Sequence, residues 1–356
     1  MRLAVVGVGL IGGSIALAAK QRLGAAVAGF DAAPQALEAA LGRGVLNRAC
    51  PTLAAAVADA EAVFVAVPVG ATARAVDEVL AAAPEDCVVT DVGSTKRIVV
   101  GAHADPRFVG GHPLAGAETS GVEHARADLF DRATWYLTPT STTSGLLYER
   151  LYRLLHRLGA HPEAIDPTTH DTILATVSHL PHVLANVLVA QAARTLAMGD
   201  ERLPATGPSF RDATRVAGSS SAVWTDIYVS NRDALIPQIE ETVRRLTEVR
   251  DALASADPVA LSAWNDAAAA DRRRLLEAQL GGGTLFELRA SVPNRPGVIA
   301  ELALQLGKAG VNITDMALYP AADMSEGVVA LWIAGEDAAR RAQALVDGLG
   351  FPVARA

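Results

Sequence analysis

The sequence predicts an α/β protein in three parts, and three observations support this. Up to about residue 165, short apolar runs alternate with helical stretches rich in Ala and Leu, which indicates a doubly wound, parallel sheet. From 166 to 280 the pattern is helical only. Beyond a glycine triplet at 281–283, which is typical of a linker, strand and helix patterns return in a small α+β module over 284–356.

Composition limits the classes of function. The chain has 356 residues, more than one hydrophobic core usually spans, and its net charge of −8 argues against a nucleic-acid partner. An anionic substrate therefore needs locally placed cations. The two cysteines, Cys50 and Cys87, form no disulfide framework, and we find no signal peptide and no apolar run of about 20 residues that would span a membrane. We expect a cytoplasmic protein without a membrane partner.

The first apolar run leads into a nucleotide-binding fingerprint. Gly7, Gly9 and Gly12 follow the strand pattern at 3–6 as GxGxxG and open a helical stretch. Gly7 allows a tight turn, Gly9 lets the backbone approach a pyrophosphate, and Gly12 lets the helix pack on the strand. The helix N-terminus, with Leu10 and Ile11, is where phosphates bind. This context favours a Rossmann-type dinucleotide site over a glycine turn without a ligand.

The second apolar run, at 25–30, determines which cofactor is expected. It ends at Asp31, about 20 residues beyond the fingerprint, where ribose hydroxyls are bound. A 2′-phosphate there would face a carboxylate, and residues 32–35 supply no Arg or Lys to offset the repulsion. The sequence therefore predicts NAD and not NADP.

Later strands are expected to bring polar residues to the same edge of the sheet. Their apolar runs lie at 62–67, 87–90, 108–109 and 135–137. Pro68, Ser94 and His112 follow the first three of these runs. Because ligands bind outside the carboxyl ends of parallel strands, these residues should share one crevice with Gly9.

Two positions beside this crevice, Val67 and Gly93, are expected to contact the cofactor. Ser94 has two interpretations. In the first, its hydroxyl hydrogen-bonds the His112 imidazole or the cofactor amide. In the second, it caps a helix that starts near Lys96.

His112 stands in the segment 110–121, which contains four glycines, at 110, 111, 116 and 121. Pro113 excludes the helical region for His112, so this histidine is extended or in a turn. The glycines would let loop backbone approach a ligand closely. We predict that His112 meets a substrate hydroxyl beside a nicotinamide ring; the alternative is a surface histidine in a turn.

The helical segment carries two more histidines. It begins at Asp166-Pro167, where the acid would cap the first helix. His179 and His182 are three residues apart and share a helix face, and Pro181 between them should kink the helix. We predict that both line a substrate pocket. Core or capping histidines and a metal site are the alternatives, although no zinc signature accompanies them.

The same segment supplies cations for an anionic substrate. Arg211 and Arg215 are four residues apart, with Asp212 beside them, and guanidinium groups suit carboxylates. The alternative is a solvated helix with an internal ion pair. Trp224 either lines the pocket or belongs to the core. The long Ala-rich helices are expected to form a dimer surface.

The C-terminal module has a recognisable order of elements. Strand patterns lie at 285–291, 312–318, 328–333 and 351–354, and helical patterns lie at 297–309 and 336–349. This is a split βαβ arrangement of ferredoxin-like type. With about 70 residues the module is small and is expected to pair with a copy of itself. Its function would be ligand sensing or dimerisation alone.

Taken in order, several motifs resemble the prephenate/arogenate dehydrogenase family of tyrosine biosynthesis. They lie at 7–14, 91–96, 110–121, 178–182 and 210–219, followed by Trp224. Segments 292–297 and 310–313 resemble an ACT domain, a module that senses amino acids. The resemblance implies NAD-dependent oxidative decarboxylation of prephenate to 4-hydroxyphenylpyruvate in a homodimer formed by the helical segment, with tyrosine as the natural effector of the ACT-like module.

Carried over to matching positions, the resemblance makes His112 the catalytic histidine and Ser94 the residue that orients it. His182 and Arg215 would bind the substrate, and three further residues would line the pocket: Glu118, Asp212 and Trp224. Arogenate and a 4-amino analogue of prephenate are alternative substrates. Alternative functions are a dehydrogenase of the β-hydroxyacid type, which would carry a catalytic lysine in its helical part, and a non-catalytic amino-acid sensor.

Overall fold

A computed structural model describes residues 1–116, 119–196, 206–279, 284–293, 295, 298–321 and 325–355. The chain forms two compact units, Met1–Arg244 and Arg245–Ala356. The boundary falls inside helix α11 (Arg232–Ala254), so the helical segment expected over 166–280 contributes to both units.

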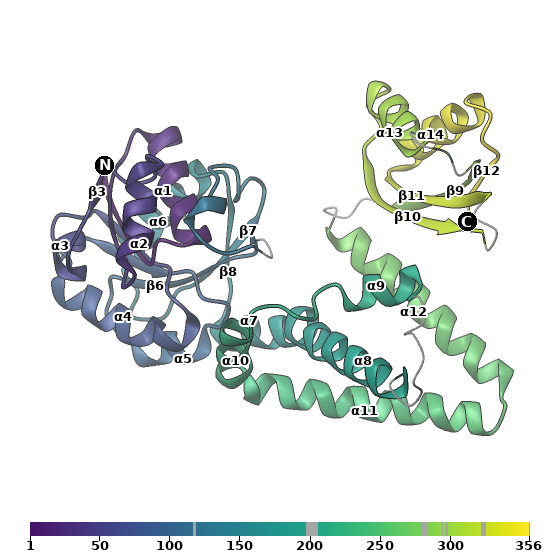
Figure 1. Ribbon diagram of the computed structural model, residues 1–356, viewed down its shortest axis with the longest axis horizontal. Helices are drawn as coiled ribbons and strands as arrows, with labels where there is room; N and C mark the ends of the chain where they lie inside the picture. The colour runs from purple at the N-terminus through teal and green to yellow at the C-terminus, as the bar shows by residue number, and fades with distance from the viewer. Residues whose placement is uncertain are drawn as a thin grey trace. The chain divides into compact units, whose positions relative to one another are not determined.

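The first unit contains a sheet of eight strands in the order β3-β2-β1-β4-β5-β6-β7-β8 (Figure 1). Neighbouring strands are parallel except β6 and β7, so the expected doubly wound sheet is present with one antiparallel pair. The strands are β1 (Arg2–Val6), β2 (Ala26–Phe30), β3 (Arg48–Ala49), β4 (Ala62–Val65), β5 (Val88–Asp91), β6 (Phe108–Pro113), β7 (Thr134–Thr138) and β8 (His161–Ala164). We did not predict β3, which has only two residues, or β8, which has no apolar run.

Helices cover both faces of this sheet (Figure 1). One face carries α1 (Leu10–Leu23), α2 (Pro34–Gly42) and α6 (Gly145–Arg157), and the other carries α3 (Leu53–Val57), α4 (Val69–Ala82) and α5 (Arg97–Ala102). A short 3₁₀ turn, η1 (Val122–His124), packs against α1 and α2. On β1, Leu3 and Val5 belong to one core, and Ala4 and Val6 belong to the other. Burial on both faces explains why the strands are continuous apolar runs in the sequence.

Strand β6 is longer than expected and includes His112. It pairs with β7 so that His112 lies opposite Tyr136. The expectation that Gly110 and Gly111 belong to a ligand-binding loop is therefore wrong. A Cβ on Gly111 would lie 2.6 Å from the Asp91 carbonyl oxygen, and one on Gly110 would lie 2.4 Å from Thr138 Oγ1, so both glycines are needed for packing inside the sheet.

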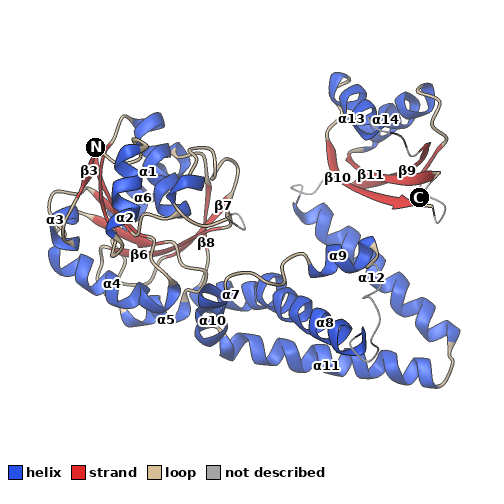
Figure 2. Cartoon of the chain, viewed as in Figure 1, coloured by secondary structure: helices blue, strands red, loops and turns tan. Residues whose placement is uncertain are grey.

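Between β8 and β9 the described residues form helices only (Figure 2). They are α7 (Pro167–Leu174), α8 (Leu180–Leu196), α9 (Pro208–Thr214), α10 (Ser221–Ser230), α11 and α12 (Pro258–Gln279). As expected, Asp166 caps α7: its carboxylate accepts hydrogen bonds of 2.9 Å from the amides of Thr168 and Thr169. A π-helical turn, η2 (Ala175–His179), joins α7 to α8. Pro181, the second residue of α8, has no amide hydrogen to continue the α-helical pattern, which explains the irregular turn.

One helical stretch is more apolar than we expected. Pro167–Arg194 is long and apolar enough to cross a membrane by length and composition, so the expectation that no such run exists is wrong. In the most apolar 18 residues of this stretch, only 28% is buried within the chain.

Three contacts join the helical segment to the carboxyl edge of the sheet. Asp226 Oδ2 accepts a 3.0 Å bond from the Gly70 amide, Thr95 Oγ1 donates to Ser230 Oγ at 3.1 Å, and Arg97 pairs with Asp233 at 2.8 Å. These contacts set α10 and the start of α11 beside the strand ends where ligands are expected.

The second unit is a four-stranded antiparallel sheet in the order β10-β11-β9-β12. Its elements are β9 (Leu285–Pro293), α13 (Val298–Lys308), β10 (Ile313–Pro320), β11 (Glu326–Ala334), α14 (Glu336–Gly348) and β12 (Val353–Arg355), close to the expected positions. Both helices lie on one face of the sheet (Figure 2). Helix α12 contacts the opposite face, where the Arg272 guanidinium lies 4.6 Å from the centre of the Trp332 ring.

Candidate active site

A buried pair of histidines lies at the carboxyl end of the sheet. His112 on β6 and His170 on α7 are 8% and 0% exposed. Nδ1 of His112 lies 2.9 Å from Nε2 of His170, and Nδ1 of His170 lies 2.8 Å from Oδ1 of Asp171. The carboxylate of Asp171 therefore reaches His112 through the ring of His170.

Asp171 also holds the start of helix α5. Its two carboxylate oxygens accept hydrogen bonds from the amides of Lys96 (2.7 Å) and Arg97 (2.9 Å). Burial would raise the pKa of Asp171, but the hydrogen bonds from His170, Arg97 and Lys96 outweigh it and lower that pKa below its ordinary value. Asp171 is thus an anion that joins the histidine pair to the loop after β5.

His112 is neutral at physiological pH. Burial, with smaller contributions from His170, Lys96 and His179, lowers the pKa of His112 well below its ordinary value of 6.5. A neutral imidazole in a water-poor site is suited to accept a proton from a hydroxyl group.

A second pair of histidines lies beside the first. Asn231, which is fully buried, places Nδ2 2.8 Å from the backbone oxygen of Asp171 and 3.0 Å from Nδ1 of His179. The ring of His179 lies edge-on to Trp224, with their centres 6.1 Å apart, and His182 stacks on Trp224 at 3.5 Å. We call His112, His170, Asp171, His179 and Asn231 the histidine network.

His182 offers a polar atom to this region. Its Nδ1 is hydrogen-bonded to the Tyr228 hydroxyl and lies 3.2 Å from Nδ2 of Asn186. Its Nε2 is buried and makes no hydrogen bond of normal geometry with the described residues, although the Val216 backbone is near enough to affect the ring. A buried nitrogen without a partner costs free energy unless a ligand satisfies it.

Stability should depend on pH because of these histidines. Burial lowers the pKa of His179 to about 4. Between pH 6.5, the ordinary pKa of histidine, and about pH 4, the His179 ring binds a proton in the unfolded chain but not in the folded chain. The free energy of unfolding is therefore highest above pH 6.5 and decreases as the pH falls below this value. We expect His179 alone to contribute a loss of about 2 kcal/mol between pH 7 and pH 5.

Urea denaturation midpoints at pH 7 and pH 5 measure this effect. A His179→Gln variant, which cannot titrate at that position, should lose less stability than the wild type over the same range. Equal midpoints at both pH values in the wild type would contradict the prediction.

The glycine-rich loop after β1 is tightly packed at Gly7 and Gly12 and open at Gly9. Gly7 has φ +92°, and a Cβ there would lie 2.4 Å from the Ala66 carbonyl oxygen; a Cβ on Gly12 would lie 2.0 Å from the Gly7 oxygen. By contrast, a Cβ on Gly9 would meet nothing within 4 Å. Gly9 is the N-cap of α1 and offers no side chain, so the first amides of the helix, those of Leu10 and Ile11, stay available to a phosphate.

Asp31 at the end of β2 supports this loop. Oδ2 accepts a 2.7 Å bond from the Val8 amide, and Oδ1 accepts one of 2.8 Å from Ala33. Each carboxylate oxygen still has capacity to accept a ribose hydroxyl. The loop, the uncapped helix start and this acid together fit a dinucleotide with a free 2′-hydroxyl.

Alanine at Gly9 and at Gly12 should have different effects. Gly12→Ala forces a Cβ against backbone and should cost about 1–3 kcal/mol of stability. Gly9→Ala should leave the unfolding midpoint unchanged and weaken cofactor binding, because its methyl group enters the space above the loop. Thermal unfolding and fluorescence titration with NADH measure the two effects, and the reverse pattern would contradict this assignment.

Ser94 and the arginines were predicted as site residues but do not belong to the histidine network. Ser94 is half-buried and makes no side-chain hydrogen bond to any described residue, so its role beside His112 stays a prediction. The alternative, Ser94 as a helix cap, is wrong, because α5 begins at Arg97 and Asp171 binds its first amides. Arg211, Asp212 and Arg215 lie exposed on or just after α9, and Glu118 lies outside the described residues.

Three residues of the histidine network were missed in the sequence: His170, Asp171 and Asn231. A signal was available for two of them. His170 and Asp171 follow a capped helix start, and a polar pair on the buried side of a helix is uncommon without a function. Nothing near Asn231 in the sequence distinguishes it from a residue at an ordinary helix end.

Comparisons with known proteins identify the family of this chain. Residues 15–164 match the family model described as prephenate dehydrogenase, nucleotide-binding domain, and residues 166–264 match the one described as prephenate dehydrogenase, dimerization domain. Prephenate dehydrogenase of Bacillus subtilis is 34% identical over 354 residues, which cover 96% of this chain and 95% of that protein. Cyclohexadienyl dehydrogenase of Zymomonas mobilis is 32% identical over 72% of this chain and 89% of its own length.

Solved structures of the same family are also similar to this chain. Prephenate dehydrogenase from A. aeolicus, in complex with hydroxyphenyl propionate and NAD⁺, has a TM-score of 0.72 and 27% identity, and the match covers 77% of this chain and 98% of that one. Arogenate dehydrogenase from Synechocystis has a TM-score of 0.68 and 26% identity, with 77% and 100% covered. The two family models together match more than half of the sequence, and this chain therefore belongs to the prephenate dehydrogenase family.

Proposed function

We propose that this chain catalyses the NAD-dependent oxidative decarboxylation of prephenate to 4-hydroxyphenylpyruvate. The observation that carries the proposal is His112, a buried neutral imidazole at the same sheet edge as the open glycine-rich loop. The nucleotide-binding family model and the NAD⁺ complex of the A. aeolicus relative support NAD as the cofactor. The acid at Asp31 agrees with this choice.

The chemistry needs little more than orientation and one proton acceptor. Bound NAD⁺ accepts a hydride from the ring carbon that carries the hydroxyl group. His112 takes the hydroxyl proton as the carbonyl forms. The ring carboxylate then leaves as CO₂, and its bonding electrons complete the aromatic ring. His112 returns the proton to the phenolate oxygen, so the product keeps its hydroxyl group. Aromatisation makes the step effectively irreversible.

The site residues keep the roles that we expect from the sequence. His112 is proposed as the catalytic residue and Ser94 as the residue that orients it. His179, His182, Asp212, Arg215, Trp224 and Glu118 form the substrate pocket. The rings of His179 and His182 both contact Trp224, which supports a common pocket for these three residues.

Arg215 is proposed to bind a substrate carboxylate, so Arg215→Ala should mainly raise KM. A hydrogen bond to a charged group contributes about 1.5–3 kcal/mol, which corresponds to a KM about 10- to 150-fold higher. Arg211→Ala, four residues earlier on α9, is the matched control, because the Arg211 guanidinium donates to the Thr206 carbonyl oxygen at 3.0 Å. A larger rise in KM for the Arg211 variant would contradict the assignment.

A direct assay tests the function. NADH formation is followed with prephenate and with arogenate, each with NAD⁺ and NADP⁺, and CO₂ release is measured in the same samples. We expect equal amounts of NADH and CO₂ from prephenate and NAD⁺. A clear preference for arogenate would make arogenate the substrate in place of prephenate. No turnover of either compound would favour a non-catalytic sensor.

The helical segment is proposed to form a homodimer, which the family description of residues 166–264 supports. Large apolar side chains are exposed there, including Val187 (52%), Leu188 (42%) and Ile236 (51%). A partner's helices would cover this surface and explain why the apolar stretch Pro167–Arg194 is so little buried. Light scattering after gel filtration should give twice the mass of the chain.

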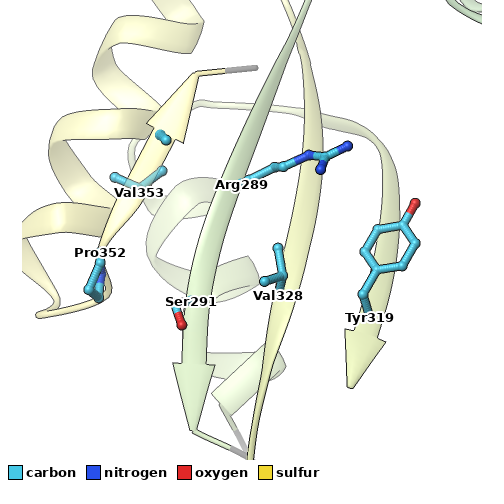
Figure 3. Close-up of a pocket in the computed structure, with 7 residues that line it drawn as sticks. Arg289, Ser291, Tyr319, Val328, Pro352 and Val353 are labelled. Atoms are coloured by element: carbon cyan, nitrogen blue, oxygen red, sulfur yellow. The ribbon is translucent and has the colours of Figure 1, made fainter. Parts of the chain in front are cut away.

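The second unit is proposed to be an ACT-type regulatory module with tyrosine as effector. Its βαββαβ order supports the resemblance. On the sheet face away from α13 and α14, a cavity of about 420 Å³ is lined by residues that include Arg289, Ser291 and Tyr319 (Figure 3). The guanidinium of Arg289 would bind an amino-acid carboxylate there. Inhibition by tyrosine that an Arg289→Ala variant loses would support this site.

The cytoplasm remains our proposed location. Both cysteines, Cys50 and Cys87, are buried free thiols, which fits a reducing compartment.

A further inference from the structure

We propose that Asp171 fixes the protons of two active-site histidines in opposite ways, so that His112 presents a bare nitrogen and His179 presents an N–H. Its carboxylate controls His112 through His170, and its backbone oxygen controls His179 through Asn231. His170, Asp171 and Asn231 are positioning residues. The consequence for turnover rests on the proposed function; the proton positions themselves do not.

The first half of the argument follows the hydrogens from Asp171 to His112. The carboxylate can only accept, so Nδ1 of His170, 2.8 Å away, must donate. A neutral His170 then has no hydrogen on Nε2, and this nitrogen accepts from Nδ1 of His112 at 2.9 Å. His112 is neutral, so its own Nε2 carries a free lone pair. This lone pair is the one that can take a proton from a substrate hydroxyl.

The second half follows the hydrogens from the Asp171 backbone to His179. A carbonyl oxygen only accepts, so the Asn231 atom 2.8 Å from it must be the amide nitrogen, which fixes the orientation of this side chain. The other hydrogen of that NH₂ group points to Nδ1 of His179 at 3.0 Å, which therefore accepts. A neutral His179 then carries its hydrogen on Nε2 and can donate to a substrate oxygen.

The arrangement has a chemical reason. In water a neutral histidine prefers its hydrogen on Nε2, so His112 needs a strong acceptor at Nδ1 to hold the less stable form. His170, backed by an anion that is 1% exposed, is such an acceptor. When His112 becomes protonated, the same contacts stabilise the imidazolium, as the aspartate does in a Ser-His-Asp triad.

Solid-state ¹⁵N NMR of protein labelled at its histidines tests the proton positions, because ring nitrogens with and without hydrogen differ widely in chemical shift. His112→Asn and His179→Asn variants assign the signals. At pH 7.5 we expect hydrogen on Nδ1 of His112 and on Nε2 of His179. The opposite form at either ring in the wild type would overturn the proposal, whether or not the enzyme oxidises prephenate.

Two variants of His170 separate this role from a structural one. His170→Asn can still donate to Asp171 but leaves Nδ1 of His112 without an acceptor, so the His112 hydrogen should move to Nε2. We expect kcat to fall between about tenfold and the roughly 10⁴-fold that a wrong tautomer costs in the serine protease triad, with KM unchanged. His170→Gln places an amide oxygen near Nδ1 of His112 and should restore most of the loss.

Asn231→Asp tests the other ring. The new carboxylate cannot donate, so His179 should move its hydrogen to Nδ1, and KM should rise more than kcat falls. An unmoved His179 signal in this variant, or equal kcat in the Asn and Gln variants of His170, would contradict the proposal. If the wild type shows the expected protons but does not turn over prephenate or arogenate, the proposed function fails and the assignment of the protons stands.

Discussion

The His112→Asn variant is expected to turn over prephenate about 10²- to 10⁴-fold more slowly than the wild type, with KM almost unchanged. The imidazole is the group that holds the hydroxyl proton, and this interaction strengthens only as the carbonyl forms. Asparagine has a similar polarity at Cγ but cannot take the proton. Removing an interaction that exists mainly in the transition state lowers kcat and leaves substrate binding intact.

Steady-state kinetics with NAD⁺ and prephenate measure this effect. His156→Asn on α6 is the matched control, because His156 is exposed and should leave both constants unchanged. Titration with NADH shows whether cofactor binding survives in the His112 variant. A kcat within about threefold of the wild type would remove His112 from the chemistry.

Much of the fold could be predicted because its signals are local. The strands of the first sheet are buried on both faces, so Leu3 to Val6 and Ala62 to Val65 are unbroken apolar runs. Within a single strand–turn–helix unit, the turn gives Gly7 a φ of +92°, and the Gly7 carbonyl oxygen leaves no space for a side chain at Gly12. In the second unit the helices cover one face of the sheet, so the sequence of β9 alternates, with Leu288 and Ala290 facing the helices and Arg289 facing away.

The histidine network could be predicted only in part, because its contacts are set by the tertiary fold. His112 and His170 are 58 residues apart, and Asp171 and Asn231 are 60 apart, so no spacing rule connects them. Likewise, Gly110 and Gly111 suggested a loop because contacts with β5 and β7, which require them, are invisible in the sequence. Ser94 looked like a helix cap because the true partner of α5, Asp171, lies on another helix.

The buried ion pair beneath the site allows a large effect on stability to be predicted. Lys96 and Asp91 are both completely buried and joined by a salt bridge. Asp91 also accepts hydrogen bonds from the amides of Gly93 (2.8 Å) and Gly111 (3.0 Å), so it holds the strand that carries His112. Lys96→Met would leave a buried carboxylate without a cation. We expect the free energy of unfolding to fall by about 3–5 kcal/mol.

Urea denaturation of three variants separates this effect from a simple loss of packing. The double variant Asp91→Asn/Lys96→Met has no buried charge and should regain part of the stability, because the penalty comes from an unpaired ion and not from the missing bond. Arg74→Met breaks an exposed pair with Glu78 and should cost less than about 1 kcal/mol. If the double variant is as unstable as Lys96→Met alone, the charge of Asp91 is not the cause. In that case the loss of stability would come from changed packing between β5 and β6 around residue 96.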